Sequence, residues 1–356
     1  MCGIAGIISN NKNFRSKSKD LLAGIRHRGP DSEGVFIHDS VCLIHSRLSI
    51  LDISESGNQP MTSFNERYVI VFNGEIYNYI ELSKYIDKDF DLDKISDTRI
   101  ILEFIQRKGV KSFLDLADGM WSFALYDREK FELFLSRDIS GQKPLFYYKN
   151  ENEICFSSNC SSLITHIGYE LKNEELKTFI ESKKLDLKLT NNIDQVKPGS
   201  FLRISTKEIN ILDEEFYFNI PKSRSLFSTQ KRANKILLES MKITLRSHAN
   251  LGFFLSGGID STISLLYATK IIEPSKITAF SVKFQETDFD ESHNASIVAS
   301  KLGVNHEILT LKPINVIDFF EKTDFRNLDY IGDSSLFPIF YLSKYASNKV
   351  KVIITG

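Results

Sequence analysis

The sequence has few residues of the kinds that mark disulfide-rich, collagen-like or low-complexity proteins. Its 356 residues include four cysteines, eight prolines and 18 glycines, and these numbers exclude all three classes. No two cysteines form a CxxC pair, so zinc-ribbon and thioredoxin motifs are absent as well. We therefore expect free thiols in a reducing compartment.

Long apolar runs and an excess of one charge are also missing. The apolar runs are short, as at Leu251–Leu255, and none approaches the roughly 18 residues of a membrane helix. The 45 Lys and Arg residues nearly balance the 46 Asp and Glu residues, which leaves no basic face for nucleic acid or membrane. The start, Met-Cys-Gly-Ile-Ala, is no signal peptide. We expect a soluble, cytoplasmic protein with no nucleic-acid or membrane partner.

What is present is a core-forming composition, with 42% hydrophobic residues, in a chain long enough for about two domains at roughly 150 residues each. Short apolar runs fill the first half and predict a sheet-dominated domain with few helices. The predicted strands are Ile4–Ile8, Val41–Ile44, Tyr68–Phe72, Met120–Tyr126, Phe131–Leu135, Leu145–Tyr148 and Ile154–Phe156, and helical periodicity appears near Leu21–Ile25 and Ile100–Ile105.

The pattern changes after about residue 185. Residues 185–230 are polar and predict a linker with one small hairpin near Phe201–Leu212. From residue 230 onward, helices and strands alternate, which predicts a parallel sheet with right-handed crossovers. The expected helices are Lys231–Arg246, Asp260–Lys270, Glu291–Leu302 and two more before residue 350, and the strands are Leu251–Leu255, Ile277–Val282, Glu307–Leu309 and Val350–Thr355.

The first candidate for chemistry is Cys2, which directly follows the initiator methionine. Removal of Met1 would expose a free α-amino group with a pKa of about 8. That amine can serve as the base for its own thiol, as it does for an N-terminal threonine nucleophile. Alone, this motif is weak evidence, and the simpler interpretation is that Cys2 is an ordinary second residue without a catalytic role.

Further motifs follow Cys2 in a fixed order. They are Arg28-Gly29-Pro30-Asp31, His45–Leu51, Gly57–Met61, Asn73–Asn78, Ser96-Asp97-Thr98, Arg137-Asp138 and Gly141–Leu145. In this order and spacing they resemble the class II glutamine amidotransferases, and among them the asparagine synthetase family. The resemblance runs from residue 2 to about 205 and implies an α+β N-terminal-nucleophile domain, a four-layer αββα sandwich over residues 2–205. A linker would follow at residues 206–229.

The resemblance also implies catalytic roles. Cys2 would attack the side-chain amide of glutamine and form a thioester. The backbone N–H of Gly74 and the side chain of Asn73 would form the oxyanion hole, whose donors each contribute about 3–4 kcal/mol in typical enzymes. Without the resemblance, Asn73-Gly74 is a candidate type I′ turn.

Glutamine itself is a zwitterion, and the resemblance implies residues for both of its charges. Arg47 would hold the α-carboxylate with its planar fork, and Glu75 and Asp97 would hold the α-ammonium group. The expected glutamine site comprises Arg47, Leu48, Ser49, Ile50, Leu51, Asn73, Gly74, Glu75 and Asp97.

Two of these residues have simpler interpretations, and one position departs from the family. Arg47 is a candidate surface cation at a strand end, and Asp97 is a candidate helix N-cap. The family usually has Ser-Asp-x-Glu, where this sequence has Arg99. Because Arg99 lies two positions after Asp97 on a predicted helix, we expect it to point away from the site.

A second motif, Leu-Ser-Gly-Gly-Ile-Asp-Ser-Thr at Leu255–Thr262, follows a predicted strand and opens a predicted helix. Glycines let backbone N–H groups approach an anion, and a helix N-terminus adds partial positive charge. The motif therefore predicts a pyrophosphate cradle, which differs from the Walker A and dinucleotide fingerprints. A Gly-Gly turn with Ser and Asp capping the helix is the simpler interpretation.

This second motif resembles the ATP-pyrophosphatase motif found in asparagine synthetases. The resemblance implies that residues 230–356 are the N-terminal part of an ATP-dependent synthetase domain. That domain is an α/β parallel-sheet fold of the adenine nucleotide alpha hydrolase type, and it uses ATP and Mg²⁺. The expected ATP-binding residues are Leu255, Ser256, Gly257, Gly258, Asp260, Ser261, Val282, Thr355 and Gly356. No metal ligand is assigned, and His306 with Glu307 lacks partners at ligand spacing.

The sequence ends at Gly356, directly after a predicted strand and at the point where such domains place a binding loop. We expect a truncated gene, a fragment or an unusual remnant, with an incomplete synthetase domain. The leading functional prediction is a glutamine-hydrolysing, asparagine synthetase-like amidotransferase, with aspartate as the default acceptor. Another acceptor carboxylate such as a surface-polysaccharide sugar acid, a glutaminase alone, and an inactive product are the alternatives. A homodimer is one candidate assembly.

Overall fold

The computed structural model describes residues 2–11, 14–49, 54–86, 91, 95–169, 192–218, 230–246, 250–285, 290–312, 318–319, 321, 333 and 335–356. The chain divides into two compact units. The described residues of the first lie within Met1–Pro221, and those of the second lie within Lys222–Thr323 and Asp333–Gly356. Among the described residues, no helix is long and apolar enough to cross a membrane.

The first unit contains a six-stranded antiparallel sheet with the order β10-β8-β9-β1-β3-β2. Its central strand β1 is the first strand of the chain and lies between β3 and β9. The strands are β1 Gly3–Ser9, β2 Ser32–His38, β3 Val41–Arg47, β8 Phe146–Lys149, β9 Glu153–Ser157 and β10 Ile193–Gln195.

A second six-stranded antiparallel sheet has the order β12-β11-β7-β6-β5-β4. The hairpin predicted near Phe201–Leu212 exists as β11 and β12, but its place in a linker is wrong. Strand β11 pairs with β7, so the hairpin completes the sheet. The strands are β4 Met61–Thr62, β5 Tyr68–Ile76, β6 Gly119–Asp127, β7 Glu132–Arg137, β11 Ser200–Ser205 and β12 Asn210–Phe216.

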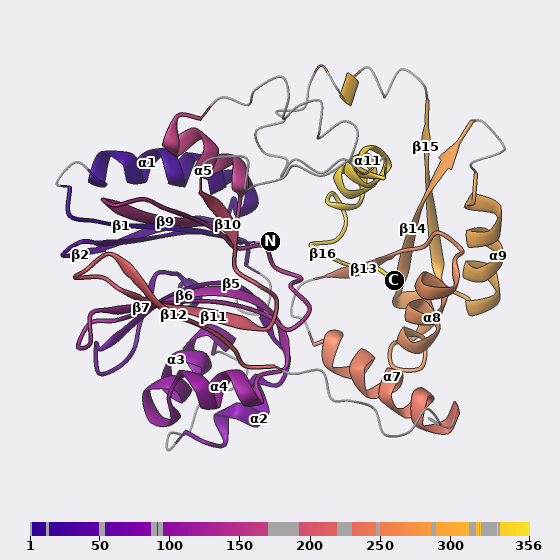
Figure 1. Ribbon diagram of the computed structural model, residues 1–356. Helices are drawn as coiled ribbons and strands as arrows, with labels where there is room; N and C mark the ends of the chain where they lie inside the picture. Colours follow the sequence, from indigo (N-terminus) through magenta and orange to yellow (C-terminus); the bar gives the residue numbers. More distant parts are fainter. Residues whose placement is uncertain are drawn as a thin grey trace. The chain divides into compact units, whose positions relative to one another are not determined.

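Helices cover the outer faces of both sheets (Figure 1). Ile4 and Ile8 of β1 share the core between the sheets with Val71 of β5, whereas Ile7 on the other face packs with Leu21 of a helix. A third cluster joins the second sheet to its own helices. The four layers confirm the predicted αββα sandwich. The helices are α1 Phe14–Ile25 and α5 Cys160–Ile167 on the first sheet, and α2 Tyr79–Ser83, α3 Asp97–Lys108 and α4 Val110–Leu116 on the second.

The second unit has a four-stranded parallel sheet with the order β15-β14-β13-β16, as the alternating pattern predicted. Of the two helices expected before residue 350, one is α11. The other would lie between β15 and α11, where only residues 312, 318, 319, 321, 333 and 335 are described. The elements are α7 Gln230–Thr244, β13 Leu251–Phe254, α8 Ile259–Ala268, β14 Thr278–Phe284, α9 Ser292–Leu302, β15 Asn305–Leu311, α11 Leu336–Ala346 and β16 Val352–Ile354.

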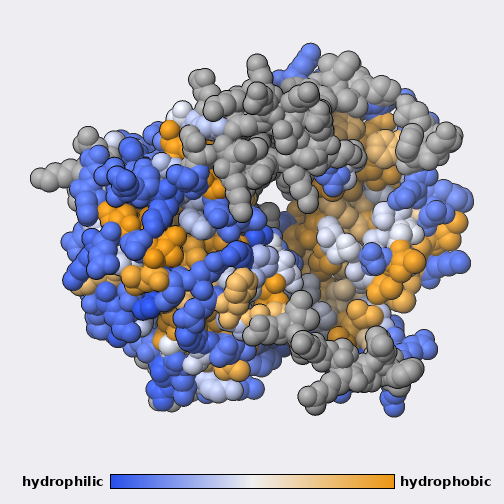
Figure 2. All heavy atoms as spheres, viewed as in Figure 1, coloured by the Kyte–Doolittle hydropathy of each residue, from blue (hydrophilic) through white to orange (hydrophobic). Residues whose placement is uncertain are grey.

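Surface hydropathy differs along the chain. Much of the visible surface over the first unit is hydrophilic, with scattered apolar side chains (Figure 2). In the second unit, helix α7 buries none of its described residues, and its apolar Ile236 and Leu237 are exposed. These two side chains of α7 are therefore not used by the core of their own unit.

Candidate active site

Cys2 lies directly before β1, with its thiol at the end of β3. The backbone N–H of Leu48 donates to the Cys2 sulfur at 3.4 Å, and the thiol lies 3.6 Å from the Leu48 carbonyl oxygen. The Cys2 carbonyl accepts a hydrogen bond from Nε of Arg28 at 3.2 Å. Burial raises the pKa of the thiol, while the Leu48 hydrogen bond and the Arg47 charge act in the opposite direction. The predicted nucleophile is thus held on two sides and remains partly exposed.

Asn73 and Gly74 lie inside β5, so the interpretation of these two residues as a turn is wrong. Asn73 pairs with Ser122 of β6, and Gly74 pairs with Trp121. A Cβ atom at Gly74 would lie 2.2 Å from the carbonyl oxygen of Met120, so only glycine fits there. Asn73 is fully buried, and among the described residues neither atom of its amide has a partner. A buried polar group without a hydrogen-bond partner lowers the free energy of unfolding by about 1–3 kcal/mol. A bound ligand that hydrogen-bonds to the group would remove this penalty.

A buried histidine links β3, the strand that ends beside the Cys2 thiol, to β5, the strand that contains Asn73. The Nε2 atom of His45 on β3 lies 3.2 Å from the Phe72 carbonyl oxygen on β5. Burial lowers the pKa of His45 to about 3, so the ring is neutral. Gln59 accepts from the Phe72 N–H at 2.7 Å and donates to Thr98 Oγ1 of α3 at 3.2 Å. These contacts fix β3, β5 and the start of α3 relative to one another.

Arg47 ends β3 and is only 6% exposed, so its interpretation as a surface cation is wrong. Its Nη1 donates to the Ser54 carbonyl at 2.6 Å and to Oδ1 of Asn58 at 2.9 Å. Ser54 and Asn58, which follow β3 in the chain, therefore orient the guanidinium. A buried cation of fixed orientation suits recognition of a carboxylate.

The next predicted residues are described only in part. The Ser49 N–H donates to Oδ2 of Asp31 at 2.8 Å, so the Arg-Gly-Pro-Asp motif supports the loop after β3. Ile50 and Leu51, also predicted for the glutamine site, lie outside the described residues.

Asp97 is the first residue of α3, and its interpretation as the N-cap is wrong. Ser96 is the N-cap, and its side chain accepts from the Arg99 N–H. Asp97 instead accepts a hydrogen bond at 3.0 Å from the N–H of Ile76, one residue beyond Glu75. Burial, followed by the negative charge of Asp97, raises the pKa of the buried Glu75 to about 7.

The sequence motif Gly141–Leu145 contributes a residue that was not assigned to the site. Lys143 is 7% exposed, and its charge acts on both Glu75 and Cys2. Its backbone N–H donates to Oδ2 of Asp138 at 3.0 Å. Burial lowers the pKa of the lysine. The sequence feature that could have identified Lys143 as a site residue is its position in a turn motif directly after a buried strand.

Arg99 points away from Asp97, as its position on the helix predicted. Its Nη1 donates to the Thr62 carbonyl at 2.6 Å and to Oε1 of Glu103 at 3.3 Å. The guanidinium also lies 4.6 Å from the ring centre of Phe64. Arg99 therefore supports the packing of α3 near β4.

In the second unit, the Gly-Gly loop joins β13 to α8. Gly257 has a φ of 84°, and a Cβ atom there would lie 2.8 Å from both Asn294 Cβ and Ala295 N. Ser256 accepts from the Gly258 N–H at 3.1 Å. The N-cap is Gly258 and has no side-chain hydrogen bond, so the interpretation of Ser and Asp as caps is wrong. The exposed first turn of α8 can therefore receive an anion.

A cavity of about 280 Å³ lies beside this loop, where the parallel strands β13, β14 and β16 end. Gly356 packs closely on α8, because a Cβ atom at this position would lie 2.2 Å from the Ser261 nitrogen. Asp260 is exposed in the first turn of the same helix. Six of the predicted ATP-binding residues line the cavity: Leu255, Ser256, Ser261, Val282, Thr355 and Gly356.

His306 and Glu307 have partners of other kinds. Nε2 of His306 lies 2.8 Å from Oγ of Ser281. Glu307 forms an ion pair with Lys349 at 2.6 Å and accepts from the Tyr345 hydroxyl at 2.8 Å. Both residues therefore have roles in the packing of the second unit.

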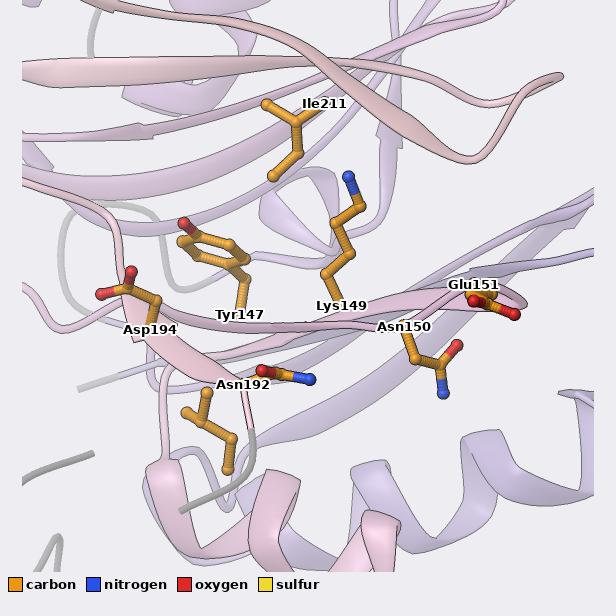
Figure 3. A pocket seen from close by; sticks show the side chains of 8 residues that line it. Tyr147, Lys149, Asn150, Glu151, Asn192, Asp194 and Ile211 are labelled. Carbon is orange, nitrogen blue, oxygen red and sulfur yellow. The ribbon is translucent and has the colours of Figure 1, made fainter. Parts of the chain in front are cut away.

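A further cavity, of about 570 Å³, lies in the first unit beside β8, β10 and β12. Tyr147, Lys149 and Asp194 are among its lining residues (Figure 3). None of the residues predicted for glutamine or ATP is among the described residues that line it.

Comparisons with known proteins agree with the two halves of the chain. The family model of the glutamine amidotransferase domain matches residues 1–217, and that of asparagine synthase matches residues 232–356. A putative glutamine-hydrolysing asparagine synthetase 2 of Methanocaldococcus jannaschii is 31% identical, over 100% of this chain and 74% of that protein. Asparagine synthetase 1 of Bacillus subtilis is 30% identical, over 100% of this chain and 57% of that protein.

Asparagine synthetase B of Escherichia coli is also 30% identical, over 86% of this chain and 54% of that protein. The chain thus spans between about half and three quarters of the length of these relatives. Among solved structures, a glutamine phosphoribosylpyrophosphate amidotransferase from B. subtilis is 15% identical with a TM-score of 0.47, over 87% of this chain and 81% of that chain.

Proposed function

The chain belongs to the glutamine-hydrolysing asparagine synthetase family, and from this premise we propose that its first unit hydrolyses glutamine with Cys2 as the nucleophile. The observation that carries the proposal is the fully buried Asn73 amide, which has no partner among the described residues. An amide N–H in that position suits an oxygen that gains negative charge during acyl transfer.

The proposed reaction begins after removal of Met1. The Cys2 sulfur forms a bond to the side-chain carbonyl carbon of glutamine, and the thiol proton moves to the free α-amino group. The carbonyl oxygen becomes negative and accepts hydrogen bonds from the Asn73 side chain and the Gly74 N–H. The carbon–nitrogen bond then breaks, and the leaving nitrogen takes the proton back from the α-ammonium group of Cys2 and departs as ammonia. Water cleaves the thioester, which yields glutamate and restores the thiol.

The charges around Cys2 complement a free amino acid. Arg47 would bind the α-carboxylate, and Glu75 with Asp97 would bind the α-ammonium group. The hydrogen bond from Ile76 to Asp97 holds that carboxylate at the end of β5, and the loop at Leu48 and Ser49 would form the adjoining wall. Because Glu75 and Asp97 are both buried, a positive charge between them relieves their mutual repulsion.

We further propose that the second unit binds ATP, which activates an acceptor carboxylate. The phosphates would lie at Ser256, Gly257, Gly258 and Ser261, and the nucleotide would extend along the cavity toward Val282 and Thr355. The glycine backbone and the open first turn of α8 fit an anion. Mg²⁺ would neutralise phosphate charge, and Asp260 is the carboxylate that the cradle itself offers.

The remaining assignments are proposals of the same kind. Aspartate is the proposed acceptor, and another small carboxylate is its alternative. We propose that the first domain extends past the expected boundary at residue 205 to the end of β12 at Phe216, because β12 pairs with β11, and that the second domain comprises residues 230–356. A homodimer is the assembly that we would test first.

The test compares ammonia release from glutamine by the wild-type protein, Cys2→Ala and Cys42→Ala. We expect no release from Cys2→Ala and little change in Cys42→Ala, because Cys42 is buried inside β3. Mass spectrometry of acid-quenched wild-type protein should show a glutamyl adduct on the Cys2 peptide. Ammonia release by Cys2→Ala at the wild-type rate would refute the assignment of the nucleophile.

A further inference from the structure

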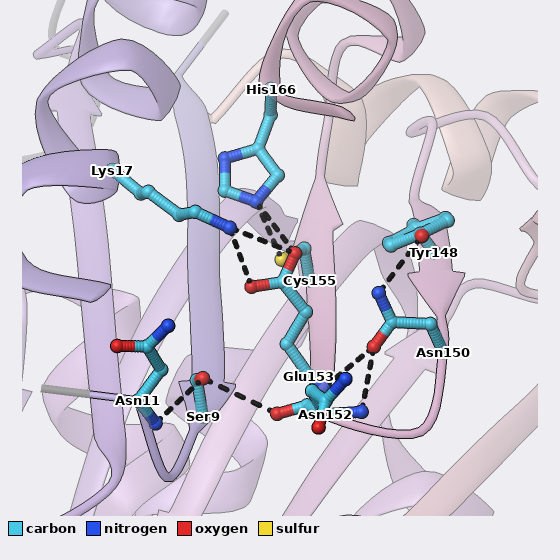
Figure 4. Close-up of polar contacts among 9 residues, drawn as sticks. All are labelled: Ser9, Asn11, Lys17, Tyr148, Asn150, Asn152, Glu153, Cys155 and His166. Carbon is cyan, nitrogen blue, oxygen red and sulfur yellow. Dashed lines mark hydrogen bonds and ion pairs between the residues drawn. The ribbon is translucent and has the colours of Figure 1, made fainter. Parts of the chain in front are cut away.

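Three side chains of the first unit converge outside the residues assigned to glutamine. Glu153 and Cys155 lie two positions apart on β9, and His166 lies in the last turn of α5. Nε2 of His166 is 3.2 Å from Sγ of Cys155 and 3.3 Å from Oε1 of Glu153 (Figure 4). One ligand atom from each residue lies within 4.8 Å of the other two.

The side chains of this cluster are buried. The His166 side chain is fully buried, and 9% of the Glu153 side chain is exposed. The sulfur and the carboxylate oxygen both face the same imidazole nitrogen, and a single proton on that nitrogen cannot serve both acceptors well. Among the described residues, the other ring nitrogen, Nδ1, has no partner.

We propose that Glu153, Cys155 and His166 bind a divalent transition-metal ion, with Zn²⁺ as the first choice. Thiolate, imidazole and carboxylate are the three ligand types that zinc takes in proteins, at about 2.3 Å for sulfur and about 2.0–2.2 Å for nitrogen and oxygen. Tetrahedral angles with these lengths separate sulfur from nitrogen by about 3.5 Å and nitrogen from oxygen by about 3.4 Å. The observed separations differ from these by a few tenths of an ångström.

The ammonium group of Lys17 on α1 is a positive charge that already pairs with the Glu153 carboxylate of this cluster. Its Nζ lies 3.1 Å and 3.4 Å from the two carboxylate oxygens of Glu153. The Lys17 side chain is 41% exposed, so it can turn into solvent and open a path to the cluster. Metal entry would then form bonds to sulfur, nitrogen and oxygen, break the S–H bond of Cys155 and release that proton to solvent.

Such an ion would fasten α5 to β9. The helix otherwise meets the sheet through apolar packing by residues such as Leu163 and Ile164, and through the hydrogen bond from Ser162 Oγ to Ser157 Oγ at 2.6 Å. Because the ion would join two elements of the fold, its binding should raise the thermal stability of the first unit.

The experiment uses full-length protein carrying Cys2→Ala, which removes the partly exposed thiol and leaves the three buried ones. After chelator treatment and dialysis, Co²⁺ is added as a probe and then displaced by Zn²⁺. We expect one equivalent of Co²⁺ with a thiolate-to-cobalt charge-transfer absorption, visible bands typical of tetrahedral cobalt, and a higher Tm with Zn²⁺.

Added to this background, Cys155→Ser and His166→Gln should lose the cobalt spectrum, whereas Cys160→Ser, at another buried cysteine, should keep it. Lys17→Met, which removes the competing cation, should bind severalfold more tightly. Circular dichroism separates lost binding from lost folding, and Lys17→Met gives a readout even where a ligand variant does not fold. A background protein without the thiolate absorption, or a spectrum unchanged in Cys155→Ser and His166→Gln, would overturn the proposal.

Discussion

The carboxyl group of Asp97 lies close enough to Glu75 for its negative charge to raise the pKa of that residue. Burial is the larger cause, and the pKa of Glu75 reaches about 7. Lys143 acts in the opposite direction. The proposed ammonium site therefore contains a carboxyl group that changes charge near neutral pH.

We expect glutamine binding to weaken as the pH falls below about 7, because a protonated Glu75 no longer attracts the α-ammonium group. In Glu75→Gln, binding should be weak at every pH, and the part of the acid limb of kcat/KM near pH 7 should disappear, while the limb set by the α-amino group near pH 8 remains. Initial rates measured from about pH 5.5 to about pH 8.5 check this. An acid limb near pH 7 that persists in Glu75→Gln would assign the titration to another group.

The same residue affects stability. The folded-state pKa of Glu75 lies above its ordinary value of 4.5, so its contribution to stability is lost as the pH rises from about 4.5 through about 7. At about 1.4 kcal/mol per pH unit, ionisation costs roughly 3 kcal/mol in the fold. Urea unfolding of Glu75→Gln should show a gain of up to about this size at about pH 8, which shrinks toward zero as the pH approaches about 4.5.

Lys143→Met and Asp97→Asn should move the pKa of Glu75 in opposite directions. Loss of the lysine charge removes a cause that lowers this pKa, so the acid limb should move to higher pH. Loss of the aspartate charge should move it to lower pH. NMR titration of the Glu75 carboxyl carbon is the measurement, with Lys130→Met in the exposed β6–β7 turn as the control. Shifts in the same direction for both variants would contradict the arrangement of charges.

Gly257→Ala should affect mainly the stability of the pyrophosphate cradle, whereas Gly258→Ala should affect mainly its binding of anions. Alanine at position 257 adopts the left-handed region, which costs about 1–2 kcal/mol, and its Cβ meets Asn294 and Ala295. Alanine at position 258 meets only Ser256 Oγ, at 3.2 Å. We expect a lower Tm for Gly257→Ala, and weaker ATP binding with little change in Tm for Gly258→Ala. Thermal unfolding and calorimetric titration measure the two effects.

Arg99→Ala should lower stability and leave the KM for glutamine nearly unchanged. The variant loses the hydrogen bond to Thr62 and the contacts with Glu103 and Phe64, and together these are worth about 1–3 kcal/mol. Urea unfolding and glutamine kinetics on the same preparation check both parts. A large rise in KM without loss of stability would place Arg99 in the glutamine site.

Much of the fold could be predicted because its central strands are strongly apolar. The predicted strand at Tyr68–Phe72 stopped short of β5, which continues to Ile76. Asn73, Gly74 and Glu75 have low strand propensity, but pairing with β6 overrides it. Strand β2 was missed because it is an edge strand in which exposed residues alternate with half-buried ones.

The site was predictable in its residue types but not in its contacts. The Arg47 guanidinium is held by the backbone of Ser54 and the side chain of Asn58, and no local pattern in the sequence predicts these two contacts. The ligands of the proposed metal site span Glu153 to His166 with spacings that match no zinc motif. Only the packing of α5 on β9 brings them together.

The central position of β1 also governs when the first sheet can be completed. Its neighbours are β3 at Val41–Arg47 and β9 at Glu153–Ser157. A ribosome that adds about 5–20 residues per second takes roughly 5 to 20 seconds to pass from the first neighbour to the second. During that interval β1 has one pairing edge open, and Cys2 at its start lies beside a sheet that is not yet complete. Maturation of the nucleophile can therefore precede closure of the sheet that holds it.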